Sequence, residues 1–113
     1  MKKIFVIAIM LCAYLTFAQE EKNVIYTENG DLTEATYYYD NGVIQQEGTF
    51  NKAGKLHGVW TSYDINGDKV TVGRYIEGRK VGKWLFWTKD NVIREVIYDN
   101  SKITAVNEKV AAN

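Results

Sequence analysis

Short hydrophobic segments separated by polar turns run through residues 23 to 106 of the chain. The segments are rich in Val, Ile, Thr, Tyr, Phe and Trp, the residues that suit a pleated, half-buried surface. No segment repeats apolar residues at helical spacing, and turn signals recur roughly every 8 to 12 residues. The pattern predicts eight strands, at residues 23–28, 32–39, 43–50, 57–63, 68–76, 82–88, 92–98 and 102–106.

The connections between these segments are too short for a parallel crossover, which needs about a dozen residues. Neighbouring strands are therefore expected to run antiparallel. Three Asn-Gly pairs, at residues 29–30, 41–42 and 66–67, match two-residue hairpin loops, because Asn and Gly tolerate the positive φ that both central residues need. The sequence predicts an all-β fold, an antiparallel meander of hairpins, with residues 107–113 as a C-terminal tail that frays or forms a helical turn.

Two stretches, residues 50–67 and 75–91, share the spacing of their glycine and aromatic residues. Four pairs, each separated by 24 positions, carry this period: Gly54 and Gly78, Gly58 and Gly82, Trp60 and Trp84, and Tyr63 and Trp87. A fixed period of this length is the signature of a repeat architecture.

The repeated residues are expected to have mechanical roles. Gly54 and Gly78 would form turns. Gly58 and Gly82 would begin a strand where the missing side chain lets a bulky ring of the next repeat lie flat against the backbone. The repeated aromatic side chains would then stack along the sheet as ladders, each pair adding about 0.5 to 1.5 kcal/mol.

The repeat pattern resembles the MORN repeat, in the degenerate variant of bacterial YwqK-like proteins, where a tyrosine, spaced glycines and a tryptophan mark each hairpin. The His57-Gly58 step is similar to the His-Gly step of that motif, whereas the second unit has Val81 in place of His and Asn91 in place of the closing Gly. Weaker copies flank the two units. The resemblance implies an elongated single-layer sheet in which each repeat contacts chiefly its neighbours.

For function, the resemblance implies a scaffold that contacts proteins or membranes, and in some bacterial cases an antitoxin. The antitoxin role fits poorly with the start of this chain, which has the pattern of a secretory signal peptide. Lys2 and Lys3 precede an apolar run that ends with the small residues Thr16 and Ala18. The run is shorter than the roughly 20 residues that span a bilayer, so an uncleaved anchor is the less favoured alternative.

We therefore expect cleavage after Ala18, export to the periplasm or medium, and no transmembrane segment afterwards. Cys12 leaves with residues 1–18, so neither a disulfide nor thiolate chemistry is expected of the remainder. That remainder carries 12 basic and 14 acidic residues with no concentrated positive charge, and nucleic-acid binding is not expected. Its length suits one small β-repeat domain, residues 19–106, before the tail.

Candidate chemistry is sparse. His57 is the only histidine, so the chain offers no His pair for a metal, and no nucleophile is fixed beside it. The acidic run at residues 64–68 lacks the spacing of a helix-flanked calcium loop. We expect no cofactor, no metal and no enzymatic activity.

The aromatic residues are the candidate binding site. Both faces of a single-layer sheet cannot be covered, and exposed Tyr and Trp side chains often mark contacts with a partner. The expected partner is a protein or envelope surface. The alternatives are rings that cover one another, self-association through the edge strands, and stacking on carbohydrate. The candidate partner-binding residues are Trp60, Tyr63, Tyr75, Trp84 and Trp87.

Overall fold

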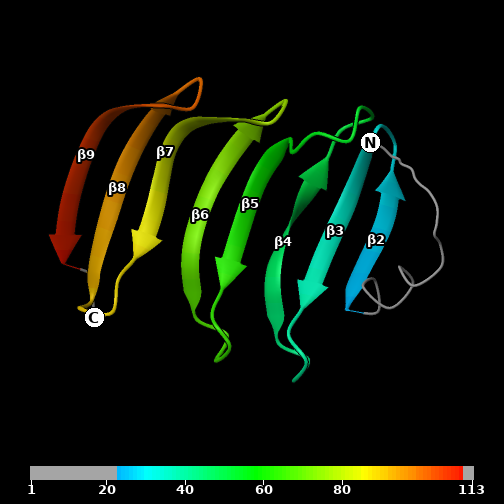
Figure 1. Ribbon diagram of the computed structural model, residues 1–113, viewed down its shortest axis with the longest axis horizontal. Helices are drawn as coiled ribbons and strands as arrows, with labels where there is room; N and C mark the ends of the chain where they lie inside the picture. Colours follow the sequence, from blue (N-terminus) through cyan, green and yellow to red (C-terminus); the bar gives the residue numbers. More distant parts are fainter. Residues whose placement is uncertain (1–22, 111–113) are drawn as a thin grey trace, which may run out of the picture.

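The computed structural model describes residues 23–110, which form one eight-stranded antiparallel sheet whose strands follow chain order (Figure 1). This confirms the all-β meander predicted from the sequence. The predicted signal peptide, residues 1–18, lies outside the described residues. The strands are β2 (Val24–Asn29), β3 (Leu32–Tyr38), β4 (Ile44–Phe50), β5 (Gly58–Tyr63), β6 (Lys69–Ile76), β7 (Arg79–Trp87), β8 (Val92–Asp99) and β9 (Lys102–Val110).

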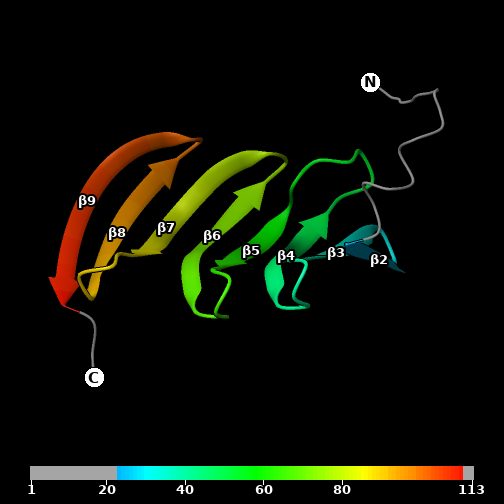
Figure 2. The same ribbon diagram turned by 60° about the horizontal axis from the view of Figure 1, so that its bottom comes forward.

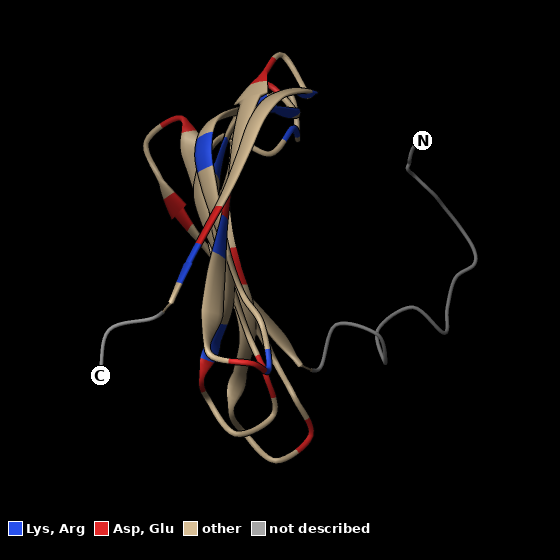
Figure 3. Cartoon of the chain, turned by 90° about the vertical axis from the view of Figure 1, so that its left-hand side faces the viewer, with Lys and Arg blue, Asp and Glu red and all other residues tan. Residues whose placement is uncertain are grey.

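The sheet is an open, curved single layer with extents of 47 × 33 × 23 Å (Figure 2). Viewed from the β9 side it is one thin, twisted layer (Figure 3). Within residues 23–110 no second layer packs on it, so few side chains can be enclosed. The hydrophobic side chains that are buried are Ala35, Trp60, Trp84 and Val96.

Two strands are longer, by two residues or more, than the sequence predicted. Strand β7 begins at Arg79, because the two-residue turn before it lets pairing with β6 resume at once. Strand β9 pairs with β8 as far as Val110. Residues 107–110 are therefore strand, and their assignment to a fraying or helical tail was wrong.

The turns at one end of the sheet have three-residue loops. In each loop only the third residue has positive φ: Gly42, Gly67 and Asn91. The flanking residues close each loop by a backbone hydrogen bond of 2.8 to 2.9 Å. The prediction of two-residue loops at 41–42 and 66–67 was wrong. A two-residue loop of this type needs positive φ at both positions, whereas the observed three-residue loops need it at one position only.

The turns at the other end include two-residue loops with positive φ at both positions, Glu77-Gly78 and Asn100-Ser101. This is the type I′ geometry that matches strand twist. Asn29 still pairs with Leu32, so the first loop is Gly30-Asp31 and only Gly30 has positive φ. The prediction placed that loop one residue too early.

The buried residues form a row that crosses the sheet. The strand register pairs Ala35 with Gly48, Trp60 with Gly73, and Trp84 with Val96. In the middle of this core row, from Gly48 to Trp84, glycine and tryptophan alternate. The tryptophan rings therefore have room to lie across the neighbouring strand, which is how a single layer buries them.

Candidate functional site

Each buried tryptophan lies over a glycine of the preceding strand. A Cβ atom built on Gly48 would come within 2.1 Å of the Trp60 ring, and one on Gly73 within 1.9 Å of the Trp84 ring. Neither glycine has positive φ. They are glycines because an aromatic ring occupies the place of a side chain.

The glycines expected to admit these rings, Gly58 and Gly82, do not do so. A Cβ on Gly58 would meet only the Thr49 hydroxyl oxygen at 2.8 Å, and no atom lies within 4 Å of one on Gly82. Their φ angles are +107° and +75°. The expectation was wrong about the ring, and backbone conformation is the physical reason for glycine at both positions.

Gly54 and Gly78 lie in turns, as expected, with φ of +79° and +83°. The sequence reasoning overlooked Gly48 and Gly73. The signal that could have found them is their position inside predicted strands, since glycine within a strand marks a close approach of another group.

Both indoles are also anchored by their nitrogen. Trp60 Nε1 donates to the carbonyl oxygen of Thr49 at 2.9 Å, and Trp84 Nε1 donates to that of Arg74 at 3.2 Å. Each acceptor immediately follows the glycine beneath the ring. A buried indole needs such a partner, so the two units share one complete arrangement.

Further aromatic rings surround Trp60. The Phe50 ring stands at 76° to it with centroids 5.1 Å apart, and the Tyr37 ring is tilted by 34° at 6.5 Å. Tyr37 in turn makes an edge contact with Tyr26. The rings cover most of Trp60, whose exposed fraction is 7%.

Trp84 is enclosed by more neighbours. Tyr75 stands at 88° to it with centroids 5.1 Å apart, Tyr98 at 71° and 5.7 Å, and Phe86 stacks at 24° and 6.2 Å. The Lys80 ammonium lies 5.1 Å from the Trp84 ring centre, a cation–π contact. Trp84 is only 4% exposed.

Tyr63 and Trp87 do not share a face with the buried tryptophans. Side chains alternate along a strand, and Tyr63 follows Trp60 by three positions, as Trp87 follows Trp84. The Tyr63 hydroxyl donates to Glu47 Oε2 at 2.9 Å on that other side. The expectation that these four residues stack together along the sheet was therefore wrong. We call the two sides the tryptophan face and the opposite face.

The tryptophan face is hollowed between its two indoles. A pocket of about 250 Å³ lies there. Its lining contains no charged side chain, and all of its residues except the two tryptophans are half-buried. The lining residues are Tyr37, Gln46, Phe50, Leu56, Trp60, Ser62, Thr71, Tyr75 and Trp84. Of the predicted partner-binding residues, three thus meet at one site.

The other polar candidates have structural roles. His57 Nδ1 accepts a hydrogen bond from the backbone N–H of Glu77 at 3.1 Å. Asp64 Oδ1 accepts from the N–H groups of Asn66 and Asp68 within its own loop, at 2.9 and 3.0 Å. Among the described residues, no three His, Cys, Asp or Glu side chains gather as metal ligands.

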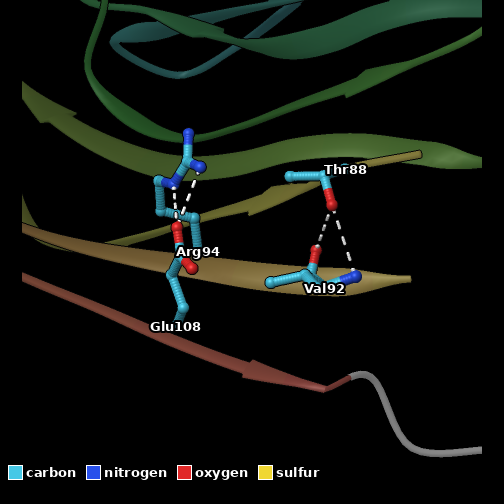
Figure 4. Close-up of polar contacts among 4 residues, drawn as sticks. All are labelled: Thr88, Val92, Arg94 and Glu108. Carbon is cyan, nitrogen blue, oxygen red and sulfur yellow. Dashed lines mark hydrogen bonds and ion pairs between the residues drawn. The ribbon is translucent and has the colours of Figure 1, made fainter. Parts of the chain in front are cut away.

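Polar contacts also fix the last strands of the sheet. Arg94 on β8 pairs with Glu108 on β9 at 2.8 Å, and the Thr88 hydroxyl donates to the Val92 carbonyl oxygen at 3.1 Å across a loop (Figure 4). The Arg94–Glu108 pair joins β9 to β8 although every residue of β9 is exposed, and the Thr88 hydrogen bond fixes the loop between β7 and β8.

Within the described part of the chain, three side chains have clearly shifted pKa values. Burial, reinforced by the neighbouring Tyr26 side chain, raises the pKa of Tyr37. The hydrogen bond to Glu47 raises the pKa of Tyr63. On the opposite face, the hydrogen bond from Lys109 lowers the pKa of Glu95, with Lys83 adding to the effect. The pocket wall at Tyr37 therefore stays neutral well above physiological pH.

No protein-family model, curated protein or solved structure matches the chain. In residues 23–110 there is also no helix with the length and hydropathy needed to cross a bilayer.

Proposed function

We propose that the protein is an exported, non-enzymatic binding module of the MORN-repeat type that holds a partner on its tryptophan face. The observation that carries the proposal is the uncharged, aromatic-walled pocket on a sheet face that no second layer covers within residues 23–110. Pockets that combine aromatic walls with a few polar groups are the usual form of a binding site.

The burial of the tryptophans changes which residues would contact the partner. Trp60 and Trp84 are largely covered by their neighbours, so their main role is to hold the pocket in shape. The half-buried rings of Phe50 and Tyr75 remain accessible from the pocket. Tyr63 and Trp87, on the opposite face, are not part of this proposed surface.

The test is a capture experiment with tagged protein, residues 19–113, on envelope and culture-fluid fractions. Ser62→Arg places a long charged side chain in the pocket, and its neighbour Thr61→Arg places the same side chain on the opposite face. Both variants are first checked for folding by circular dichroism. We expect a partner that is captured by wild type and Thr61→Arg but lost with Ser62→Arg. A partner retained equally by both variants would refute the tryptophan face as the site.

Export is tested separately, by expressing the full chain and locating it by cell fractionation. We expect mature protein that begins at Gln19 in the periplasm or medium. Full-length protein found in the cytoplasm would refute this part of the proposal.

A second candidate function is self-association through the edge strand β9. Along β9 the apolar residues Ile103, Val106 and Val110 are 58%, 52% and 76% exposed. An exposed edge strand offers unpaired backbone groups to another chain. Light scattering would show a molar mass that rises with protein concentration if this function holds, and a constant monomer mass if it does not.

A further inference from the structure

The pocket on the tryptophan face has a polar floor. The strand register pairs Gln46 with Ser62 and Ser62 with Thr71. Their side chains therefore stand in one row across β4, β5 and β6, spaced by about 5 Å, the distance between neighbouring strands. One amide and two hydroxyl groups line up at the base of the pocket, and all three can donate or accept a hydrogen bond.

Two aromatic rings form walls beyond one edge of this floor, because Phe50 follows Gln46 by four positions on β4 and Tyr75 follows Thr71 by four on β6. Phe50 and Tyr75 are nearly perpendicular to the indoles that they contact, at 76° and 88°. Because those indoles lie over the glycine backbone of the sheet, the two rings stand upright. Their flat faces are directed sideways, along the sheet surface, where they border the pocket.

The lining carries no charge. Lys80, which contacts one of the pocket's tryptophans, packs over the Trp84 and Tyr98 rings at 5.1 and 5.0 Å and does not line the pocket. A phosphate or carboxylate ligand would thus find no cation here, and a cationic ligand no carboxylate. The site suits a neutral molecule that has polar groups on its edge and C–H bonds on its faces.

A pyranose ring has this combination of surfaces. Equatorial hydroxyl groups around its edge can bond to an amide and two hydroxyls, and its C–H faces can pack on aromatic rings, whose faces carry partial negative charge. We infer that the pocket binds a neutral oligosaccharide, with one sugar ring against Phe50 and Tyr75 and the hydroxyls of a neighbouring sugar ring on Gln46, Ser62 and Thr71. This inference rests on the proposed binding function of the same face.

The test is a titration of the isotope-labelled protein, followed in amide NMR spectra. Cellotetraose and chitotetraose are the neutral probes, and trigalacturonic acid is the charged comparator. We expect saturable shifts with a neutral probe at millimolar concentration or below, largest at Gln46, Ser62 and Thr71. The acidic probe should cause none.

Substitutions then test the polar floor. Thr71→Val keeps the shape of the side chain but removes its hydroxyl, and the dissociation constant should rise about fivefold, as for one hydrogen bond. The matched control Thr61→Val, on the opposite face, should leave it unchanged. Gln46→Ala serves the same purpose if Thr71→Val does not fold.

Three outcomes would overturn the inference: no saturable shift with either neutral probe, tighter binding of the acidic probe, or shifts that gather on the opposite face. An unchanged dissociation constant in both floor variants would overturn it as well. If these results came with a protein partner that Ser62→Arg loses, the binding function would stand and only its ligand class would be rejected.

Discussion

The two repeat units, which contain Trp60 and Trp84, are built alike, but their strands are connected differently. In both, an indole lies over a glycine of the preceding strand and its nitrogen bonds to the next carbonyl oxygen. The first unit joins its strands through a long loop, residues 51–57, whereas the second uses the two-residue turn Glu77-Gly78. The contact between tryptophan and glycine therefore does not depend on the turn beside it.

The units also differ in enclosure. Trp84 is surrounded by Tyr75, Phe86, Tyr98 and Lys80, while the structure places two aromatic rings around Trp60. The pocket opens between the two units and takes most of its lining from strands β4 to β6. Both units border the candidate site, the first through Phe50 and Trp60 and the second through Tyr75 and Trp84, but the second encloses its tryptophan more fully.

Removing each indole gives the largest expected effect and measures this difference directly. Trp84→Ala and Trp60→Ala should each lower the free energy of unfolding by about 3 to 5 kcal/mol, typical for a large aromatic side chain lost from a core. Trp84→Ala should lie at the upper end because more rings lose a neighbour. Urea unfolding of both variants checks the order, and a larger loss for Trp60→Ala would contradict the comparison.

A methyl group beneath each ring should have the next largest effect. Gly48→Ala and Gly73→Ala should each cost about 3 kcal/mol, because the added Cβ displaces the indole from its buried position. Thr61→Val, a strand substitution away from both rings, is the control and should change stability little.

A double-mutant cycle isolates the contact itself. In the Trp60→Ala background, Gly48→Ala should be neutral or slightly stabilising, since the ring is gone and alanine restricts the unfolded chain more than glycine does. A cost that is the same with and without the indole would show that Gly48 is required for some other reason.

The glycines of the 24-residue period should matter less. Gly58→Ala and Gly82→Ala should each lower the free energy of unfolding by about 1 to 2 kcal/mol. The new methyl group meets no ring, but the alanine backbone must adopt a positive φ. The exposed Lys55→Val serves as a control with little effect. Thermal unfolding that ranks Gly82→Ala as more damaging than Gly73→Ala would contradict the assigned roles.

The number and order of strands were predictable from the sequence, whereas the position of the rings was not. Asn-Gly pairs and runs of β-branched and aromatic residues mark turns and strands locally, so all eight strands could be found. The partner of Trp60 depends on register across the sheet. The 24-residue period does not reveal this partner, because Trp60 and Trp84 are 24 positions apart whereas their glycines, Gly48 and Gly73, are 25 apart.

The prediction that the five aromatic candidates form one site failed for a related reason. Trp60 and Tyr63 belong to one repeat unit, and a repeat invites the view that its aromatic residues act together. Three positions along a strand, however, place them on opposite sides of the sheet. Of the predicted site, only Trp60, Tyr75 and Trp84 meet, and the polar floor of Gln46, Ser62 and Thr71 becomes visible only when three strands are aligned.

The smallest expected effect is on the pH dependence of stability, which should differ between the two halves of the sheet. Glu95, beside the second unit, has a lowered pKa because Lys109 bonds to its carboxylate, so its contribution to stability is present above the ordinary value of 4.5 and is lost as pH falls through the lowered pKa. Tyr63, within the first unit, has a raised pKa because it donates a hydrogen bond to Glu47. Its contribution to stability is therefore present below the ordinary value of 10.0 and is lost as pH rises through the raised pKa. Melting temperatures measured across pH should therefore lose their acid slope in part with Glu95→Gln and their alkaline slope in part with Tyr63→Phe. If Glu95→Gln altered the alkaline side instead, the ion pair with Lys109 would not be the source of the shift.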